Sequence, residues 1–173
     1  MSDLPPNAKL LFSEQEIEHT IDRLAVRLNI ALKDESPVFV CVLKGALPIT
    51  WDLMRRMQVD VSLSYMRVRR FDGMKGGIPQ VTEFDPEEFR DKTVVIVDTV
   101  LDEGVTFDVA REKIQPLASK LLTVVLVRKQ TSYKGTADYI GFEAPNKFLI
   151  GRGMDMSGKY RGLPAIYALD DKC

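Results

Sequence analysis

The chain has 173 residues, of which 45% are hydrophobic and 28% charged, and its formal net charge is −1 at pH 7. This composition excludes collagen-like and disordered chains, and the length suffices for one domain that needs no disulfide. The balanced charge gives no general attraction to nucleic acid or an anionic membrane, so we expect neither as a partner. Two cysteines predict no disulfide framework and no zinc site. Because the sequence lacks a signal-type segment and any run of 18 apolar residues, we expect a cytoplasmic protein.

A helix and a buried strand are the first predicted elements. Ser13 and Glu16 form a capping-box pattern, and apolar residues then recur every three or four positions, which predicts a helix over about residues 14–32. The continuous apolar run 38–43 predicts a strand covered on both faces, and it stops abruptly at Lys44-Gly45.

A second helix, a second strand and a basic loop are predicted next. Residues 47–57 have a helical pattern, and the two-residue alternation of apolar and polar residues over 59–65 predicts a half-exposed strand. The segment 67–80 is rich in arginine and glycine and has no apolar period, so we expect a basic loop there.

The second half of the chain continues the alternation of apolar strands and helices. Residues 93–97 predict a buried strand that ends at Asp98, a helix begins just beyond Gly104, and 121–127 predict another buried strand that ends near Lys129. Shorter strands are predicted at 139–142, 147–150 and 165–169. This order predicts an α/β fold with a mostly parallel, doubly wound sheet flanked by helices, whose ligand site lies beyond the carboxyl ends of the strands.

Charged and polar residues follow three of the buried strands directly. These are Lys44-Gly45, the segment 98–106 and Lys129. Because parallel strands end at the same edge of a sheet, we expect these residues to converge on one site.

The segment 98–106 has the pattern of a phosphate-binding loop. It leads from a strand through Gly104 into a helix start, where free N–H groups and the helix dipole favour an anion. Thr106 adds a hydroxyl, and the carboxylates of Asp98 and Asp102 could hold sugar hydroxyls, a metal ion or a proton. This mixture suits a nucleotide or a sugar phosphate.

The strand with Asp98, Asp102, Gly104 and Thr106 resembles the phosphoribosyl-pyrophosphate motif of type I phosphoribosyltransferases. The resemblance extends over most of the chain, because 42–45 resemble the pyrophosphate loop of that family, Lys129 its purine-contacting lysine and 141–161 the hood of its hypoxanthine-guanine branch. It implies one domain over residues 1–173, with a small hood subdomain formed by the N-terminal segment and about 139–173.

The resemblance also implies an activity in purine salvage. The family transfers the phosphoribosyl group of phosphoribosyl pyrophosphate to N9 of a 6-oxopurine and releases pyrophosphate, with Mg²⁺ as cofactor. For this chain the implied substrates are hypoxanthine and guanine, and the implied assembly is a homodimer or homotetramer.

Each site position acquires a role from the resemblance. Asp102 would be the catalytic acid or base beside purine N7, and Lys129 would donate to O6 and so reject a 6-amino base. Residues implied to bind phosphoribosyl pyrophosphate and its 5′-phosphate are Asp98, Thr99, Asp102, Glu103, Gly104, Val105 and Thr106. The implied pyrophosphate ligands are Lys44, Gly45 and Arg161, and the implied purine-binding residues are Lys129, Lys147, Phe148, Leu149 and Asp155. Asp98 and Asp155 would hold Mg²⁺, and Arg69, Arg70 and Phe71 would belong to a flexible lid. The Lys44-Gly45 peptide can be cis in this family.

Three positions depart from the family pattern. Thr99 stands where a second acid is usual, and Glu103 stands where a small hydroxyl residue is common, so we expect the Glu103 side chain to point outward. Arg69-Arg70-Phe71 replaces the usual Ser-Ser-Tyr of the lid.

These departures leave two alternatives to the hypoxanthine-guanine enzyme. One is a nucleotide-binding regulator with the same fold, for which the basic segment 67–75 would contact RNA. The other is an enzyme that prefers xanthine and guanine. Retention of Lys129, Phe148, Asp155 and Arg161 at the family spacing favours the hypoxanthine-guanine enzyme.

Overall fold

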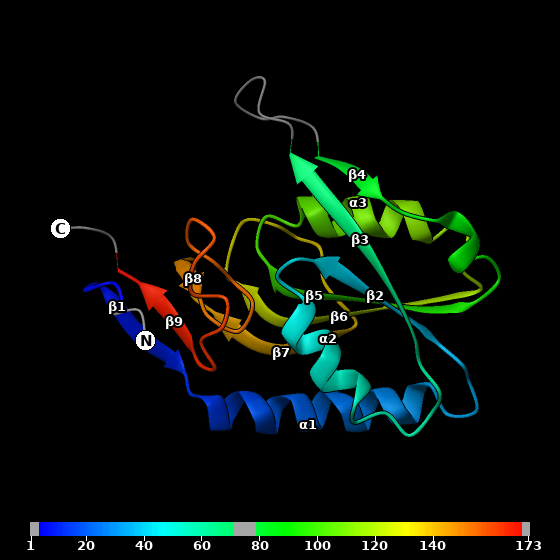
Figure 1. The fold of residues 1–173 in the computed structure, drawn as a ribbon, viewed down its shortest axis with the longest axis horizontal. Helices are drawn as coiled ribbons and strands as arrows, with labels where there is room; N and C mark the ends of the chain where they lie inside the picture. The colour runs from blue at the N-terminus through cyan, green and yellow to red at the C-terminus, as the bar shows by residue number, and fades with distance from the viewer. Residues whose placement is uncertain (1–3, 71–78, 171–173) are drawn as a thin grey trace.

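The computed structural model describes residues 4–70 and 79–170, without the side chain of Arg70 (Figure 1). The helices are α1 (Glu14–Ala31), α2 (Leu47–Met54), α3 (Val105–Ile114) and the short 3₁₀ helix η1 (Pro86–Glu88). The strands are β1 (Ala8–Phe12), β2 (Val38–Leu43), β3 (Ser62–Arg70), β4 (Pro79–Glu83), β5 (Thr93–Leu101), β6 (Lys120–Lys129), β7 (Tyr139–Ala144), β8 (Phe148–Ile150) and β9 (Ile166–Leu169). In the described part of the chain, no helix is long and apolar enough to cross a membrane.

A six-stranded sheet forms the centre of the molecule, in the order β4-β3-β2-β5-β6-β7. Its strands are parallel except β4, which pairs antiparallel with β3 at the edge. Figure 1 shows α1 and α2 on one face of this sheet and α3 on the other. The predicted mostly parallel, doubly wound α/β sheet is therefore confirmed.

Local sequence patterns explain the best-predicted elements. Ser13 and Glu16 make the predicted capping box at the start of α1, and the apolar stripe of that helix is buried. All of β2 from Val38 to Val42 is buried, because both faces of a central parallel strand are covered by helices.

The strand β3 is half-exposed as predicted, but its exposed face is the apolar one. Leu63 and Tyr65 are 56% and 53% exposed, whereas Ser64 and Met66 are buried. The Ser64 hydroxyl donates to a carboxylate oxygen of Glu88, which satisfies its polar group inside the protein. Alternation thus identified the strand, but it did not identify which face of the strand points inward.

The hairpin of β3 and β4 replaces part of the predicted basic loop. Residues 67–70 continue β3, and β4 pairs with them from Pro79 onward. The Arg67 guanidinium forms an ion pair with Glu83 at 2.7 Å across the hairpin, so its charge is compensated by the neighbouring strand. The central part of the predicted loop, 71–78, lies outside the described residues.

A second, antiparallel sheet joins the two ends of the chain in the order β1-β9-β8. It stands beside the carboxyl ends of the parallel strands (Figure 1). We call this sheet, together with the segment 151–165 between β8 and β9, the small subdomain. The strand β7 was predicted to belong to the hood, but it pairs with β6 as the edge of the central sheet. Its apolar residues complete the core over α1.

Candidate active site

Two adjoining clefts lie at the carboxyl ends of β2, β5 and β6. The first has a volume of about 500 Å³ and runs along the loop from Asp102 into the first turn of α3. The second, of about 270 Å³, lies between Lys129 and the small subdomain. Gly45, Asp98 and Asp102 line both clefts, so the predicted convergence of strand ends is present in the structure.

Gly104 shapes the start of α3. It is the N-cap residue and has φ +76°, a conformation that only glycine adopts at little cost. A Cβ atom built on Gly104 would lie 2.2 Å from Cζ of Tyr133, whose ring covers this turn. The Tyr133 hydroxyl donates to Oδ1 of Asp108 at 2.6 Å and so fixes the ring over the turn. The N-terminus of α3 faces the first cleft, where its dipole favours an anion such as phosphate.

Asp98 directly follows the five consecutive buried residues of β5, 93–97, and lines both clefts. Burial raises the pKa of its carboxyl group to about 7, although N–H groups of Thr99 and Val100 favour the charged form. The Thr99 N–H donates to Oδ1 of Asp98 at 2.7 Å. A carboxyl group in this state binds cations or sugar hydroxyls and changes its charge close to neutral pH.

Asp102 and Lys129 form an ion pair at the junction of the clefts. The Lys129 Nζ lies 2.7 Å from Oδ2 of Asp102, and its side chain is only 10% exposed. The hydroxyl of Thr131 donates to the Asp102 carbonyl at 3.0 Å, which holds the loop onto the end of β6. Sequence analysis gave these two residues separate roles, but the structure couples them.

The small subdomain supplies Phe148, Leu149, Asp155 and Arg161 to the second cleft. Phe148 is 53% exposed, so its ring is available for stacking and does not belong to the core. Asp155 Oδ1 lies 2.7 Å from Nη2 of Arg161, and the N–H of Gly158 donates to the other carboxylate oxygen.

Lys147 does not join this group. Its ammonium lies 2.5 Å from Oδ1 of Asp170, and its side chain is not among those lining the second cleft. Lys147 directly precedes β8, but its side chain points to Asp170 and not into the cleft that Phe148 lines, so its purine-binding role stays a prediction.

The loop between β2 and α2 contributes its backbone to both clefts through Gly45. The cis peptide bond of this loop is Leu43–Lys44, one bond before the Lys44-Gly45 peptide that can be cis in the family. The Lys44 side chain is exposed and lines neither cleft. Here the structure places the main chain, and not the lysine, against the site.

Two of the three positions that depart from the family pattern are described. Thr99 is 1% exposed, and its hydroxyl oxygen has no hydrogen-bond partner in the described part of the chain. Glu103 is exposed and is among the residues that line the first cleft, so the expected outward orientation of its side chain stays a prediction. Of the predicted lid, Arg69 is exposed on β3, the side chain of Arg70 is undescribed, and Phe71 lies outside the described residues.

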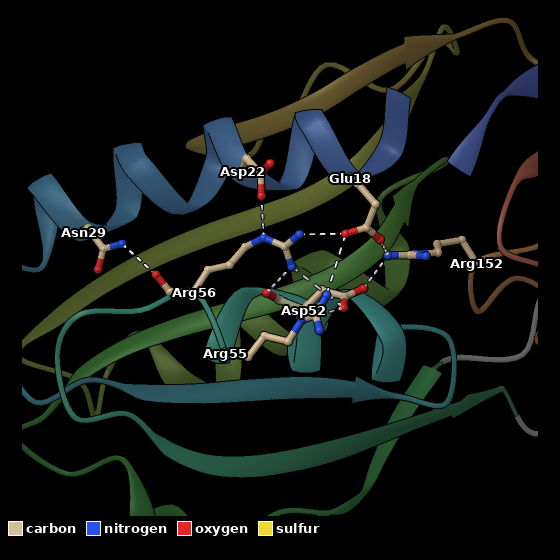
Figure 2. A network of polar contacts seen from close by, with 7 residues as sticks. All are labelled: Glu18, Asp22, Asn29, Asp52, Arg55, Arg56 and Arg152. Atoms are coloured by element: carbon tan, nitrogen blue, oxygen red, sulfur yellow. Dashed lines mark hydrogen bonds and ion pairs between the residues drawn. The ribbon is translucent and has the colours of Figure 1, made fainter. Parts of the chain in front are cut away.

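Tyr133 and Arg152 were missed by sequence analysis. Tyr133 follows β6 in a polar segment and carried no periodic signal, yet it covers Gly104. Arg152 lies in the small subdomain and enters a network of ion pairs with α1 and α2 (Figure 2). Their importance comes from contacts with residues that are distant in the sequence, and no local sequence pattern indicates such contacts.

The fold and the site together define an α/β protein that binds a phosphorylated sugar or nucleotide at the carboxyl edge of a parallel sheet. The phosphoribosyl transferase domain family matches residues 8–156. The chain belongs to this family and is a phosphoribosyltransferase, as the motif resemblance predicted.

Named relatives agree with this assignment. The chain is 31% identical to the hypoxanthine-guanine phosphoribosyltransferase of Bacillus subtilis, over 93% of this chain and 92% of the relative. It is 34% identical to that of Aquifex aeolicus, over 94% and 95%. A crystal structure of a hypoxanthine phosphoribosyltransferase from Staphylococcus aureus superposes with a TM-score of 0.87 at 27% identity, covering 94% of this chain and 91% of that chain.

Proposed function

We propose that this enzyme transfers the phosphoribosyl group of phosphoribosyl pyrophosphate to N9 of hypoxanthine or guanine, a reaction of purine salvage. The named relatives support the substrate class. The observation that carries the proposal is the Asp102–Lys129 pair, which stands between an anion-binding helix start and an exposed aromatic ring.

The phosphorylated sugar would occupy the first cleft. Backbone N–H groups at the start of α3 and the Thr106 hydroxyl would hold the 5′-phosphate, and Gly104 would allow its close approach. Asp98 would bind the ribose hydroxyls or Mg²⁺. Among the described residues, no group of three or more His, Cys, Asp or Glu side chains is arranged so that it could hold a metal ion by itself. This fits Mg²⁺, which is usually held by one or two carboxylates together with substrate phosphates and water. Asp98 and Asp155 would supply those carboxylates, and the bound ion would neutralise the pyrophosphate charge.

The purine would occupy the second cleft. Its ring would stack on Phe148, and Lys129 would donate to O6. A 6-amino base presents a donor at that position, so two donors would meet and the base would be rejected.

The chemical step exchanges one bond at C1′ of the ribose for another. The N9 lone pair forms the new bond to C1′, the C1′–O bond breaks, and pyrophosphate leaves with the electron pair. Asp102 would accept the proton from purine N7. Arg161 and the main chain at Gly45 would stabilise the charge that grows on the departing pyrophosphate.

A base panel tests the proposal. Phosphoribosyl pyrophosphate and Mg²⁺ are offered with hypoxanthine, guanine, xanthine, adenine or uracil in separate assays. We expect nucleotide formation with hypoxanthine and guanine and none with adenine or uracil. Turnover with xanthine and guanine alone would replace the proposal with the xanthine-guanine alternative. Binding of nucleotides by folded protein without turnover on any base would favour the regulator.

Two lysine variants sharpen this test. Lys129→Met should raise KM for hypoxanthine by roughly 10- to 100-fold, because O6 loses a charged donor. Lys147→Met should leave KM within about twofold, because Lys147 pairs with Asp170. The opposite ranking would show that Lys147 and not Lys129 contacts the base.

We also propose a homodimer or homotetramer. Four large apolar side chains, each more than half exposed, lie on α2 and β3 and are Leu47, Trp51, Leu63 and Tyr65. They surround an apolar cavity of about 170 Å³. An exposed apolar cluster of this kind is typical of an interface. Light scattering should give two or four times the chain mass of 19.5 kDa for the wild type and a smaller mass for Trp51→Glu.

A further inference from the structure

Arg152 connects the small subdomain to the helices on one face of the central sheet. Its side chain is 11% exposed, and Nη2 contacts Oε1 of Glu18 on α1 and lies 2.5 Å from Oδ2 of Asp52 on α2. Figure 2 shows the guanidinium reaching both carboxylates. Arg152 itself lines neither cleft, so a direct contact with substrate does not explain it.

The backbone beside Arg152 contacts residues that line the second cleft. A Cβ atom built on Gly153 would lie 1.9 Å from the Gly45 carbonyl oxygen, so the two main chains are packed directly together. The Arg161 Nη1 donates to the Gly153 carbonyl at 2.7 Å, and Arg161 also pairs with Asp155. Gly153 is therefore in contact with two residues that line the second cleft, Gly45 and Arg161, and Arg161 joins it to a third, Asp155.

The network around Arg152 divides into two parts. Arg56 joins α1 to α2 through Asp22, Glu18 and the Asp52 carbonyl. Among the residues drawn in Figure 2, Arg152 alone comes from the small subdomain. The helices are thus already tied together by Arg56, and Arg152 adds a separate tie to the subdomain.

Energetics favour a geometric role for this second tie. The Arg152 Nε is buried and has no partner among the described residues, so burial of the guanidinium is only partly compensated. Buried ion pairs add little net stability because desolvation offsets their attraction, and in some proteins they serve instead to fix the relative position of the elements they join. A guanidinium bound to two carboxylates fixes that position especially well.

We propose that Arg152 is a positioning residue, which anchors the segment 151–161 to α1 and α2 and thereby sets the positions of Gly45, Asp155 and Arg161. The kinetic part of this inference rests on the proposed function, in which Gly45 and Arg161 bind the leaving pyrophosphate. The claim that Arg152 anchors the segment 151–161 does not depend on the proposed function, because it concerns the protein without substrate.

The test compares Arg152→Met with Arg56→Met as a matched control. Each variant removes a guanidinium group that contacts both Glu18 and Asp52, through the Asp52 carbonyl for Arg56 and the Asp52 carboxylate for Arg152. Only Arg152→Met also removes the connection to the small subdomain. Arg152→Lys is a conservative variant that keeps a positive charge and tests rescue. If Arg152→Met does not fold, Arg152→Lys against Arg56→Lys gives the same comparison.

Hydrogen–deuterium exchange of the unliganded protein is the first measurement. The N–H groups of Arg152 and Gly153 donate to the carbonyls of Leu163 and Arg161, so they report directly on the anchored segment. Arg152→Met should speed exchange in 150–163 at least tenfold, whereas Arg56→Met should leave it within twofold. Unchanged exchange in Arg152→Met would overturn the proposal, whether or not the protein is an active transferase.

Kinetics are the second measurement. Arg152→Met should raise KM for phosphoribosyl pyrophosphate about tenfold or more and change KM for the base by less than threefold, with partial rescue by Arg152→Lys. Equal increases of both KM values in Arg152→Met and Arg56→Met, at equal loss of melting temperature, would show a merely structural role and overturn the proposal. An inactive wild type would refute the proposed function but leave the exchange result valid.

Discussion

Replacing Asp98 by Asn should stabilise this protein at neutral pH and at the same time weaken its binding of substrate. Burial raises the pKa of Asp98 from 3.8 to about 7. An acid with a raised pKa in the folded state holds its proton more tightly there, so the folded state loses stability as pH rises from about 4 to about 7. Since one pKa unit corresponds to about 1.4 kcal/mol, full ionisation costs the folded protein about 4 kcal/mol at most.

The Asn side chain removes this cost but keeps the local hydrogen bond. Its carbonyl oxygen can still accept from the Thr99 N–H, which lies 2.7 Å from Oδ1 of Asp98. In metal-free buffer the wild type should lose about 3 kcal/mol between pH 4.5 and pH 8, equivalent to roughly 10 °C in melting temperature. Asp98→Asn should show little change over this range and should bind Mg²⁺ with phosphoribosyl pyrophosphate far more weakly.

Urea and thermal unfolding with EDTA, repeated at half-unit pH steps, measure this difference. Asp102→Asn is the matched control, because it removes a carboxylate from the same clefts at a position whose side chain is 42% exposed. Carboxylates with lowered pKa values, such as Asp170 at about 2, titrate below this window and destabilise the protein only as pH falls. An equal slope of stability against pH in wild type and Asp98→Asn would refute the reasoning.

Three further substitutions test the candidate site. Asp102→Asn should lower turnover by roughly 10²- to 10⁴-fold and leave binding of phosphoribosyl pyrophosphate nearly intact in calorimetry; unchanged turnover would remove Asp102 as the acid or base. Gly104→Ala should lower the free energy of unfolding in urea by at least about 1–2 kcal/mol and weaken phosphate binding, because φ is +76° and the Tyr133 ring fills the space. Gly162→Ala is the control and should be near neutral, since nothing lies within 4 Å of a Cβ atom built there. A stable Gly104→Ala protein would contradict this packing argument. Thr99→Val should raise the free energy of unfolding by about 1 kcal/mol, since it removes a buried hydroxyl that has no hydrogen-bond partner among residues 4–70 and 79–170. A loss of stability would show that the hydroxyl does form a hydrogen bond.

The sequence by itself determined the elements whose patterns are local. The capping box and apolar stripe placed α1, and the continuous apolar runs placed β2, β5 and β6. It also determined that Asp98, Asp102 and Lys129 would meet, because the carboxyl ends of parallel strands share one edge. These inferences need only neighbours along the chain and the parallel arrangement of the strands.

Only the tertiary structure decided how particular side chains are paired. Arg152 contacts Glu18 and Asp52, which are 134 and 100 residues away, and Lys147 contacts Asp170 instead of the cleft. On the inward face of β3, the Ser64 hydroxyl likewise donates to a carboxylate 24 residues away, that of Glu88. Hydrophobic periodicity records which positions are buried on average, but it does not record which charged group will be within 4 Å of another. Which charged groups become neighbours depends on the packing of distant segments. The balance between the cost of desolvation and the gain from pairing, a few kcal/mol, then decides which ion pairs form.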